Sequence, residues 1–508
     1  MSHAVEFNLE KFADPALSPE YIEYLVREEA PARAMHFARL WAYYKNDLSP
    51  LGQGVDLSRN AGGDAELACA RPYVQAQEFG LPARITGRSH LGYGGTGEPR
   101  PALSRKEIVI ENDIGWRVDT GVHFLAGKAF KSESLARRPE DARRIEAVLA
   151  EVWQASGGLA LVQEIALLGA VYGFVDLVVR ATAPANGPPR AGGGLGMVES
   201  IRIEAVDAPR VLPILDENDC RRLKYWVQTF EKETNELAAP AAGQAFHQAG
   251  LLRVPAPLRR SVEVIEILGP NWWQRYEDGV LAAEGENRLG RIPVVHIQNL
   301  ANPMHYEGAG EVEPLIGLQD ELNTRLSDRA NRVTFQSFKM YLGRGIEGFE
   351  DRPVAPGRMW ATDNPDASIE TFGGDADSPS EDAHIDELRQ AMDKTSGVTP
   401  LAAGLLRDSL GNLSSATALR VVLMGTLARL ERKRLSYGDG LAEANRIVLE
   451  ALAALGILRT DPEDRATRVH WPSPLPEDMG QKLADARAKR ELGVPAETVL
   501  RELGYEPK

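Results

Sequence analysis

The 508-residue sequence has little of several features that would point to a common class of protein. Its two cysteines, Cys69 and Cys220, lie far apart and outside any metal-binding spacing, so neither a disulfide framework nor a zinc site is predicted. No run of eighteen or more apolar residues occurs, and we therefore expect no membrane span. The first residues form neither a basic nor an apolar region, so we expect no secretion signal.

Positive charge is also scarce. The chain has 58 Lys and Arg residues against 73 Asp and Glu residues, so its net charge is −15. Proteins that hold nucleic acid tightly are usually basic, because binding depends on cations that neutralise phosphates. This composition therefore excludes a protein that grips DNA by bulk charge, although it allows weak contact.

Catalytic motifs are absent as well. The sequence has no HExxH, GxSxG or paired CxxC pattern, and its nine His residues are scattered. Residues 92–97 formally match GxGxxG, but a proline-rich stretch follows where a nucleotide site needs a helix. Between Gly121 and Lys128 the spacing of a phosphate-binding loop is one residue too long, and Ala129 replaces the magnesium-binding hydroxyl. We therefore predict no enzyme, no cofactor and no metal site.

One long helical pattern organises what is present. Over residues 311–338 apolar side chains recur three or four positions apart, which indicates an amphipathic helix of about seven turns. Arg325, Arg329 and Arg332 share its other side and suit contact with phosphates. Few acids lie within reach in the same helix, Asp328 being the main one. The alternative interpretation is a solvated face, or salt bridges to a neighbouring helix.

The residues before this helix indicate a body of mixed helices and strands. Ser18 followed by Pro19 predicts a helix start. Two further helices, 143–154 and 159–171, are predicted on either side of a glycine pair. Runs of β-branched and apolar residues predict strands at 174–180, 200–205, 223–230, 262–268 and 289–297.

The residues after the helix change character twice. Short strands alternating with turns are predicted at 340–342, 358–361 and 368–372. A capping box at Ser378–Glu381 then predicts a second helix, which runs to about Lys394. A very long helical pattern covers 414–455, with one interruption and a kink expected at Tyr437–Gly440. A helix at about 476–492 and a short helix at 495–503 flank a predicted C-cap at Gly493.

The break over 397–412 is unusual because it is apolar. Pro400 and Gly404 make a continuous helix through it unfavourable. Its leucines are too apolar to remain in water without a partner. Its two charges, Arg407 and Asp408, cancel each other.

This order of elements resembles a bacteriophage portal protein of the long-tailed phage type. The resemblance extends over roughly residues 19–508 and is weakest at 49–105, 181–260 and 343–375. Thr417 stands where relatives often have Gly, which leaves the helix assignment intact. Seven local strings match the family pattern in the right order, at 118–128, 169–173, 290–295, 318–323, 396–400, 415–419, and finally 475–476 with 493–498.

The resemblance implies an α+β portal-type fold with an α/β wing, a two-helix stem, a small β clip, a long kinked helix and a C-terminal helical crown. By this analogy, the parts are the wing at 1–311, the stem helices at 312–338 and 378–396, the clip at 339–377, the tunnel loop at 397–412, the long kinked wing helix at 413–455 and the crown at 456–508.

The resemblance also implies a function. Twelve copies would form a ring at one capsid vertex of the virion, through which double-stranded DNA passes during packaging and ejection. The contact with DNA would be transient and non-specific, and assembly would occur in the bacterial host cytoplasm. The expected partners are the terminase large subunit, a head-completion or adaptor protein, and the major capsid and scaffold proteins. The alternatives are another structural ring of the head–tail connector or, less well supported, a DNA-packaging enzyme, which would need the missing phosphate loop.

Two sets of site residues follow from this resemblance. The arginine stripe would line the DNA channel of the stem or bridge subunits. The tunnel loop would form a collar at the narrowest part of the channel, by burying its leucines against neighbouring copies of itself. The alternative for this loop is a plain connection packed on its own subunit. The candidate residues are Arg325, Arg329 and Arg332 in the stem, and Leu405, Leu406, Arg407, Asp408, Leu410 and Asn412 in the tunnel loop.

Overall fold

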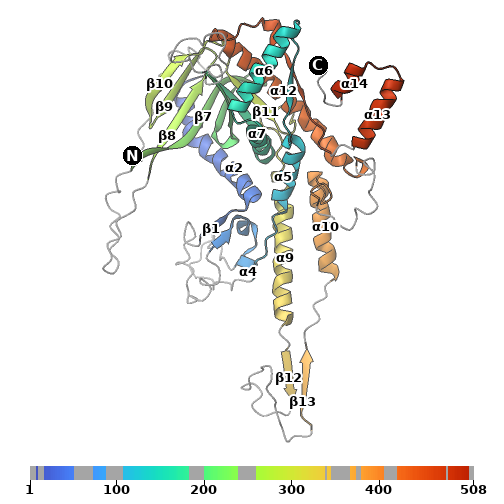
Figure 1. Ribbon diagram of the computed structural model, residues 1–508. Coiled ribbons are helices and arrows are strands. Elements are labelled where there is room, and N and C mark those ends of the chain that lie inside the picture. The colour runs from blue at the N-terminus through green and yellow to red at the C-terminus, as the bar shows by residue number, and fades with distance from the viewer. Residues whose placement is uncertain are drawn as a thin grey trace. The chain divides into compact units, whose positions relative to one another are not determined.

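The computed structural model divides the chain into two compact units (Figure 1). Unit 1 consists of Met1–Trp41, Trp116–Glu313 and Gly397–Lys508, and unit 2 of Ala42–Gly115 and Pro314–Ser396. Both units mix helices with strands, which confirms the predicted α+β composition. The structure describes residues 7, 9, 17–50, 73–86, 107–181, 200–237, 259–337, 340–344, 366–372, 379–404, 420–475 and 479–502.

Unit 1 contains two antiparallel sheets and a short strand pair. The larger sheet has the order β10-β9-β8-β7-β6 and the smaller one the order β11-β4-β5, while β14 pairs with β3. The strands of the larger sheet are β6 (Val211–Asp216), β7 (Asp219–Leu237), β8 (Arg259–Leu268), β9 (Trp272–Glu277) and β10 (Val280–Glu286). The others are β3 (Lys131–Ser134), β4 (Phe174–Ala181), β5 (Ile201–Val206), β11 (Val294–Gln298) and β14 (Thr467–His470).

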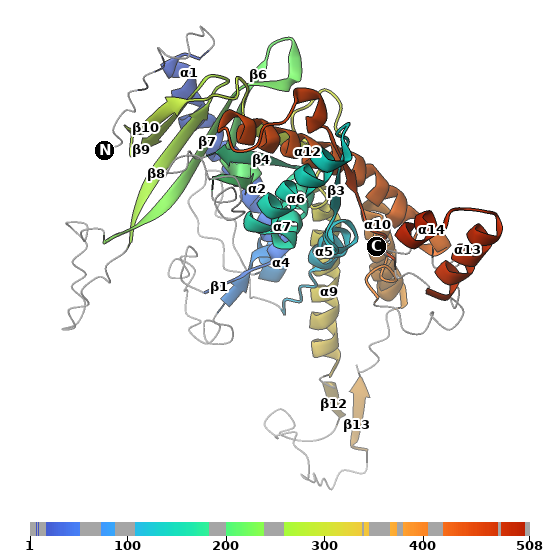
Figure 2. The same cartoon turned by 45° about the horizontal axis from the view of Figure 1, so that its top comes forward.

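Unit 1 also contains eight of the described α-helices, some of which pack on these sheets. The N-terminal helices lie against one face of the larger sheet, where side chains such as Ile22 and Leu25 pack on Val227 and Ile265 (Figure 2). The Ser18 hydroxyl caps the first of these helices by accepting from the Tyr21 N–H, as the sequence predicts. The helices are α1 (Pro19–Tyr24), α2 (Ala30–Lys45), α5 (Asp113–Ala126), α6 (Pro139–Ala155), α7 (Leu159–Tyr172), α12 (Met424–Ala454), α13 (Met479–Glu491) and α14 (Ala496–Glu502).

Most predicted elements of unit 1 are confirmed, with three corrections. The strand predicted at 289–297 covers only Val294–Gln298, because Asn287 ties the preceding residues into a turn by donating to the Arg291 carbonyl. Strands β3, β6, β9, β10 and β14 were not predicted, because they are short and two of them contain residues that disfavour a strand, Pro213 in β6 and Gly285 in β10. The predicted helix break at 157–158 is present, and both glycines there have positive φ.

The third correction concerns α12. It continues through Tyr437–Gly440, so the predicted interruption there is wrong. Close packing, and not a helix end, explains the glycine at position 440. A Cβ at Gly440 would collide with Ile297 of β11. The buried Tyr437 hydroxyl donates to Asn299 and occupies the space that a side chain at Gly169 would need. These glycines therefore serve close helix packing rather than a helix end.

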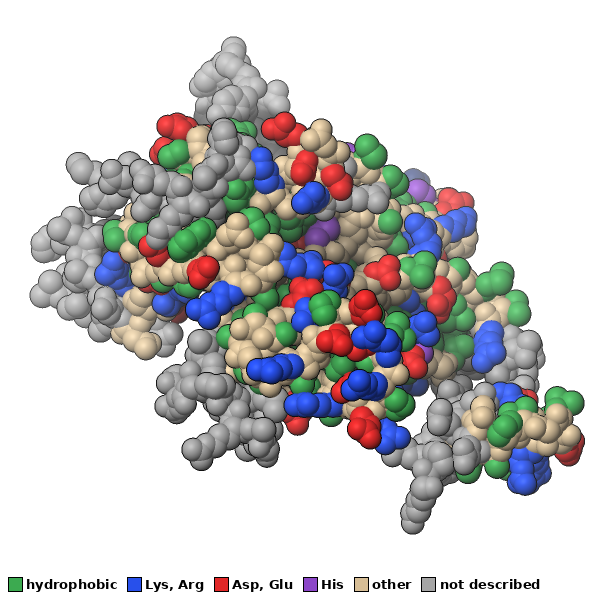
Figure 3. Space-filling model, turned by 90° about the horizontal axis from the view of Figure 1, so that it is seen from above, with side chains coloured by type: hydrophobic (Ala, Val, Ile, Leu, Met, Phe, Trp, Pro, Cys, Tyr) green, Lys and Arg blue, Asp and Glu red, His purple; other side chains and the backbone are tan. Residues whose placement is uncertain are grey.

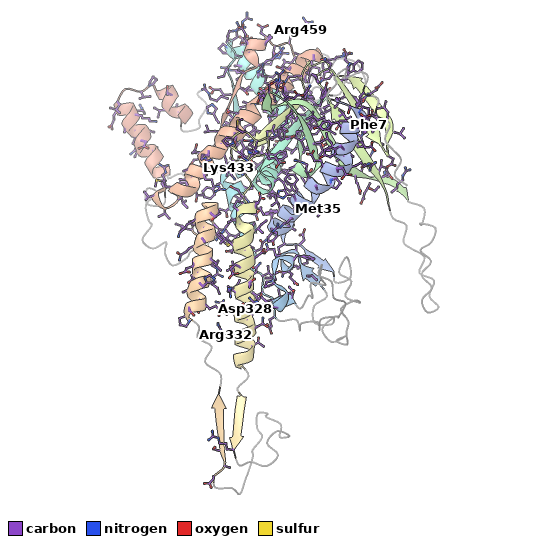
Figure 4. All side chains as sticks on the ribbon, turned by 180° about the vertical axis from the view of Figure 1, so that it is seen from behind. Phe7, Met35, Asp328, Arg332, Lys433 and Arg459 are labelled. Carbon is purple, nitrogen blue, oxygen red and sulfur yellow. The ribbon has the colours of Figure 1, made fainter. Side chains whose placement is uncertain are left out.

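A buried ion cluster within unit 1 joins α12 to Glu311. Glu311 accepts from Lys433 at 2.8 Å and from Arg429 at 3.0 Å. Lys433, labelled in Figure 4, is almost fully buried. Burial by itself would raise the pKa of the Glu311 carboxyl, but the two cations outweigh it and hold that pKa below its usual value. The Glu311 carboxylate therefore stabilises the folded chain above its unfolded-state pKa of about 4.3, and this stabilisation is lost as the pH falls.

We expect Lys433→Met to destabilise the chain by about 3–5 kcal/mol, because it leaves a buried carboxylate short of a partner. Adding Glu311→Gln should restore much of that loss, because no buried negative charge then remains. The double variant should also lose less stability than the wild type between pH 5 and pH 3. Urea unfolding at several pH values measures both effects. If the double variant is less stable than Lys433→Met alone, the interpretation is wrong.

No single helix among the described residues is long and apolar enough to cross a membrane; α6 and α7 reach that length and apolarity only as a pair bent by 70°.

Unit 2 contains the long helix that the sequence predicts. It begins at Ile316 rather than 311, because the Glu311 N–H donates to the Ala170 carbonyl and a short 3₁₀ turn, Glu313–Leu315, intervenes. The predicted second helix and two of the three predicted strands that lie between the helices are also present, while 358–361 lies outside the described residues. The elements are α9 (Ile316–Ser337), α10 (Pro379–Ser396), α4 (Ala83–Thr86), β1 (Leu48–Pro50), β2 (Tyr73–Gln75), β12 (Met340–Arg344) and β13 (Ser368–Phe372).

One face of α9 carries a ladder of buried polar side chains, which we call the polar ladder: Gln319, Asn323, Ser327 and Asn331. These side chains bind the segment 107–112, which has no sheet partner of its own, and the first residue of α5, Asp113. They accept from the N–H groups of every second residue, at 2.9 Å for Glu107, 3.0 Å for Val109, and 3.1 Å for both Glu111 and Asp113. Three of them also donate back, to the carbonyl groups of Glu107, Val109 and Glu111.

The polar ladder works because two repeats nearly match. Four residues of α-helix rise about 6.0 Å, and two residues of extended chain rise about 6.6 Å. Polar side chains spaced four apart on α9 therefore meet alternate peptide groups of the extended segment. The helix replaces a neighbouring β-strand as the partner of this backbone.

We expect Asn323→Ala to destabilise the chain by about 1–3 kcal/mol, because it leaves the Glu111 N–H and the buried Gln77 amide without their partner. The matched control is Gln390→Ala on the exposed face of α10, which should change stability by no more than about 0.5 kcal/mol. Urea unfolding followed by circular dichroism compares the two. Equal midpoints would contradict a structural role for the polar ladder.

Candidate functional site on the α9–α10 helix pair

The second long helix of unit 2, α10, packs along α9. Leu322 and Leu326 of α9 are buried, as are Ile385, Leu388 and Met392 of α10. The spacing of three or four residues in each helix gives each one apolar stripe, and the two stripes share one core. Arg329 and Arg332 of the arginine stripe pair with residues of α10, so this part of the stripe borders the contact between the helices; Figure 4 labels Arg332.

All three arginines of the stripe form ion pairs. Arg325 lies 2.6 Å from Glu321, one turn earlier in α9, and 3.7 Å from Asp328. Arg329 donates to Asp382 of α10 at 2.8 Å, and Arg332 pairs with Glu381, also of α10. Two of the three cations therefore connect the helices.

This arrangement corrects the expectation that few acids are within reach of the stripe. Glu321 was overlooked within the same helix, although its i,i+4 spacing from Arg325 is a recognisable signal. Glu381 was interpreted as part of a capping box, yet its carboxylate faces Arg332, and Ser378 lies outside the described residues. The acids in the first turn of α10 become partners of the stripe only after the chain has folded back.

Another arginine, Arg84 of α4, contacts α9. Arg84 binds Asp328 with two hydrogen bonds, at 2.5 and 2.9 Å. The hydrogen bond to Asp328 raises the pKa of Arg84 above its usual value. Asp328 thus lies between two arginines, one from α4 and one from its own helix.

The net charge of the helix pair is negative. The three arginines of α9 are balanced by three acids, whereas α10 has five acids against two bases. Side-chain exposure follows the same division, at 31–40% for the arginines but 70% for Asp386 and 76% for Glu387. On the face seen from above in Figure 3, acidic and basic side chains of the described residues are interspersed.

The tunnel-loop residues Leu405–Asn412 lie outside the described residues. The beginning of that loop, at 397–404, is described and is not helical, which agrees with the sequence prediction. Gly397 and Gly404 both have positive φ, and the Thr426 hydroxyl anchors the loop by donating to the Gly397 carbonyl.

Nothing in the described residues gathers three or more His, Cys, Asp or Glu side chains in a way that could hold a metal ion. The arrangement of the helix pair is one of helix packing and charge pairing.

Solved structures that contain a similar chain include the virion of a native gene transfer agent particle and the neck of an empty gene transfer agent particle computed with C6 symmetry. Each is 12% identical and covers 78% of this chain, with 90% and 91% of the other chain and a TM-score of 0.41. Scores at this level carry no argument about function. No curated protein matches the sequence.

The family comparison is decisive. Residues 194–505, which include the arginine stripe, α10 and α12, match the family described as phage portal protein, SPP1 Gp6-like. This match extends over more than half of the chain, and it agrees with the resemblance carried by the seven local strings. The chain therefore belongs to the phage portal protein family.

Proposed function

We propose that twelve copies of this chain form a closed ring at one capsid vertex and that double-stranded DNA passes through it during packaging and ejection. The observation that carries the proposal is the family match over residues 194–505. The ring would contact the major capsid and scaffold proteins and receive the terminase large subunit and then a head-completion or adaptor protein. It would assemble in the host cytoplasm and remain in the virion.

In this proposal α9 and α10 form the stem, within 312–338 and 378–396, and β12 and β13 belong to the clip, within 339–377. Residues 1–311 and 413–455 form the wing, and 456–508, with α13 and α14, form the crown. The grouping of Ala42–Gly115 with both stem helices in one compact unit supports a stem that is braced by part of the N-terminal region.

The charges of the helix pair support a conduit that does not retain its cargo. DNA phosphates are repelled by an acidic wall and touched weakly by a few cations, so the duplex can slide. The stem arginines would contribute only part of their charge to DNA, because each is also held by an acid. Their second role would be to brace the two stem helices against each other.

The tunnel loop, residues 397–412, would complete the channel. We propose that Leu405, Leu406 and Leu410 pack against the same loop of neighbouring copies and form a collar. Arg407 and Asp408 cancel in charge, and Asn412 is neutral, so the collar would touch DNA without clamping phosphates.

The purified chain should form a ring of twelve 55.6 kDa subunits, about 670 kDa in all, closed by head-to-tail contacts. Native mass spectrometry measures the subunit number, and negative-stain images should show a central hole. Light scattering that finds only monomers or dimers at working concentration would contradict the proposal.

Changing Arg325, Arg329 and Arg332 together to Gln should leave the helix content nearly unchanged, since each partly exposed ion pair contributes only about 0.2–1 kcal/mol. Ring integrity or DNA retention by assembled particles should fall. The matched control removes the same charge from three exposed arginines of the α6 region, by Arg138→Gln, Arg143→Gln and Arg144→Gln.

Circular dichroism and DNA content per particle distinguish the outcomes of this comparison. An unfolded stem triple variant would show that the stripe serves internal packing of the chain. Equal DNA content in the stem and control variants would exclude a role of the stripe in the conduit.

A further inference from the structure

A small pocket of unit 1 has mostly arginines as its charged lining. Its volume is about 450 Å³, and it is lined by the turn between β10 and β11, the last turns of α12, and the end of the 3₁₀ helix Pro462–Arg465. Among the described residues its charged lining consists of Arg288, Arg291, Arg446, Glu450 and Arg465. Four cations and one anion contrast with the net charge of −15 of the whole chain.

The turn that supplies Arg288 and Arg291 is fixed by Asn287. The side-chain amide of Asn287 donates to the Gly269 carbonyl at 3.0 Å and to the Arg291 carbonyl at 2.8 Å. Gly290, between the two arginines, has a φ of 66°, a conformation that residues other than glycine rarely adopt. The local sequence therefore sets the backbone from which both arginines reach the pocket.

Two glutamates of α12 offset part of the positive charge. Glu443 lies 2.6 Å from Arg291 and 3.9 Å from Arg446. Glu450 lies 3.3 Å from Arg446 and 3.8 Å from Arg291. These ion pairs hold two of the four arginines beside α12, and each pair leaves part of a guanidinium group for another anion.

The other two arginines, Arg288 and Arg465, have no acidic partner in the part of the chain that the structure describes. Arg465 is held in place by Thr460 instead, because it donates to the Thr460 hydroxyl at 3.0 Å and to the Thr460 carbonyl at 2.9 Å. The acids next to Arg465 in the sequence, within 461–464, pair with Arg137 and do not line the pocket.

The balance of charge indicates which ligand fits. Four arginines and the two glutamates that contact them leave two positive charges in excess. The C-terminal end of α12 offsets only about half a charge of this excess, and Glu286 of β10 does not line the pocket. A phosphate group carries about −1.5 to −2 charges at pH 7. The planar guanidinium group also matches the oxygens of a phosphate, to which it can donate two parallel hydrogen bonds.

We propose that this pocket binds a phosphate group, with Arg288 and Arg465 as its principal donors. The phosphate is either free inorganic phosphate or a phosphate of nucleic acid, since both present the same oxygens. This site goes beyond the proposed function, because its residues belong to neither the stem helices nor the tunnel loop and it does not require a ring.

Arg288→Gln tests the site with little disturbance, because Arg288 has no acidic partner among the described residues. Isothermal titration of the purified full chain with inorganic phosphate, at constant ionic strength, measures the affinity. The substitution should weaken binding about tenfold, as expected for the loss of hydrogen bonds between charged groups. The matched control is Arg144→Gln, which removes the same charge from an exposed position of α6 and should leave the affinity unchanged.

Glu450→Gln should have the opposite effect. It removes the acid of the pocket lining and releases Arg446 and Arg291 for the ligand, so phosphate should bind several-fold more tightly. A glutamate that serves only to hold the arginines in place would instead give weaker binding when it is replaced. Circular dichroism verifies that each variant is folded.

A short DNA duplex, titrated against the same chains by fluorescence anisotropy, distinguishes the two sources of phosphate. If nucleic acid is the ligand, Arg288→Gln should weaken duplex binding more than Arg144→Gln does. If free phosphate is the ligand, only the phosphate titration should respond. Equal affinities of the wild type, Arg288→Gln and Glu450→Gln for both probes, or no binding of either probe, would overturn the proposal and leave the proposed ring intact.

Discussion

The match between the rise of a helix and the rise of an extended chain underlies much of unit 2. Because the polar ladder of α9 accepts from every second N–H group from Glu107 to Asp113, the segment 107–112 remains extended without a sheet. The same side chains are fully or almost fully buried, and buried polar side chains need hydrogen-bond partners to be stable in the folded chain. Asn323 also receives a hydrogen bond from Gln319 and donates to Gln77, which extends the network to the β2 region. One face of α9 is thus occupied by hydrogen bonds to another segment of the same chain.

The remaining surface of α9 is also largely in contact with other residues of the chain. Its apolar stripe is used by α10, and its arginines lie at the border of that contact, where acids of both helices hold them. The cations therefore have a structural use before any ligand arrives. The net negative charge of the helix pair comes from α10, which has five acids and two bases.

The arginine stripe illustrates how far sequence reasoning reaches in this chain. Helical spacing correctly predicted that Arg325, Arg329 and Arg332 share one side of a helix, because spacing is a local property. It did not predict their partners on α10, because Glu381 and Asp382 are about 50 residues away and meet the stripe only when α10 folds back along α9. The same reason explains the missed polar ladder. Gln, Asn and Ser residues four apart resemble a solvated face until a second segment buries them.

Local sequence determined the kinds of element in this protein, since a side-chain period, a cap and a glycine pair each act within a few residues. It therefore determined α9, α10, β4, β13 and the break between α6 and α7. Tertiary structure alone decided what each polar or small residue is for. Gly440 permits contact between α12 and β11 rather than a helix end, and Glu311 delays the start of α9 because its backbone and carboxylate are held elsewhere. Such roles depend on which segments meet, and that is set by packing between residues far apart in the chain.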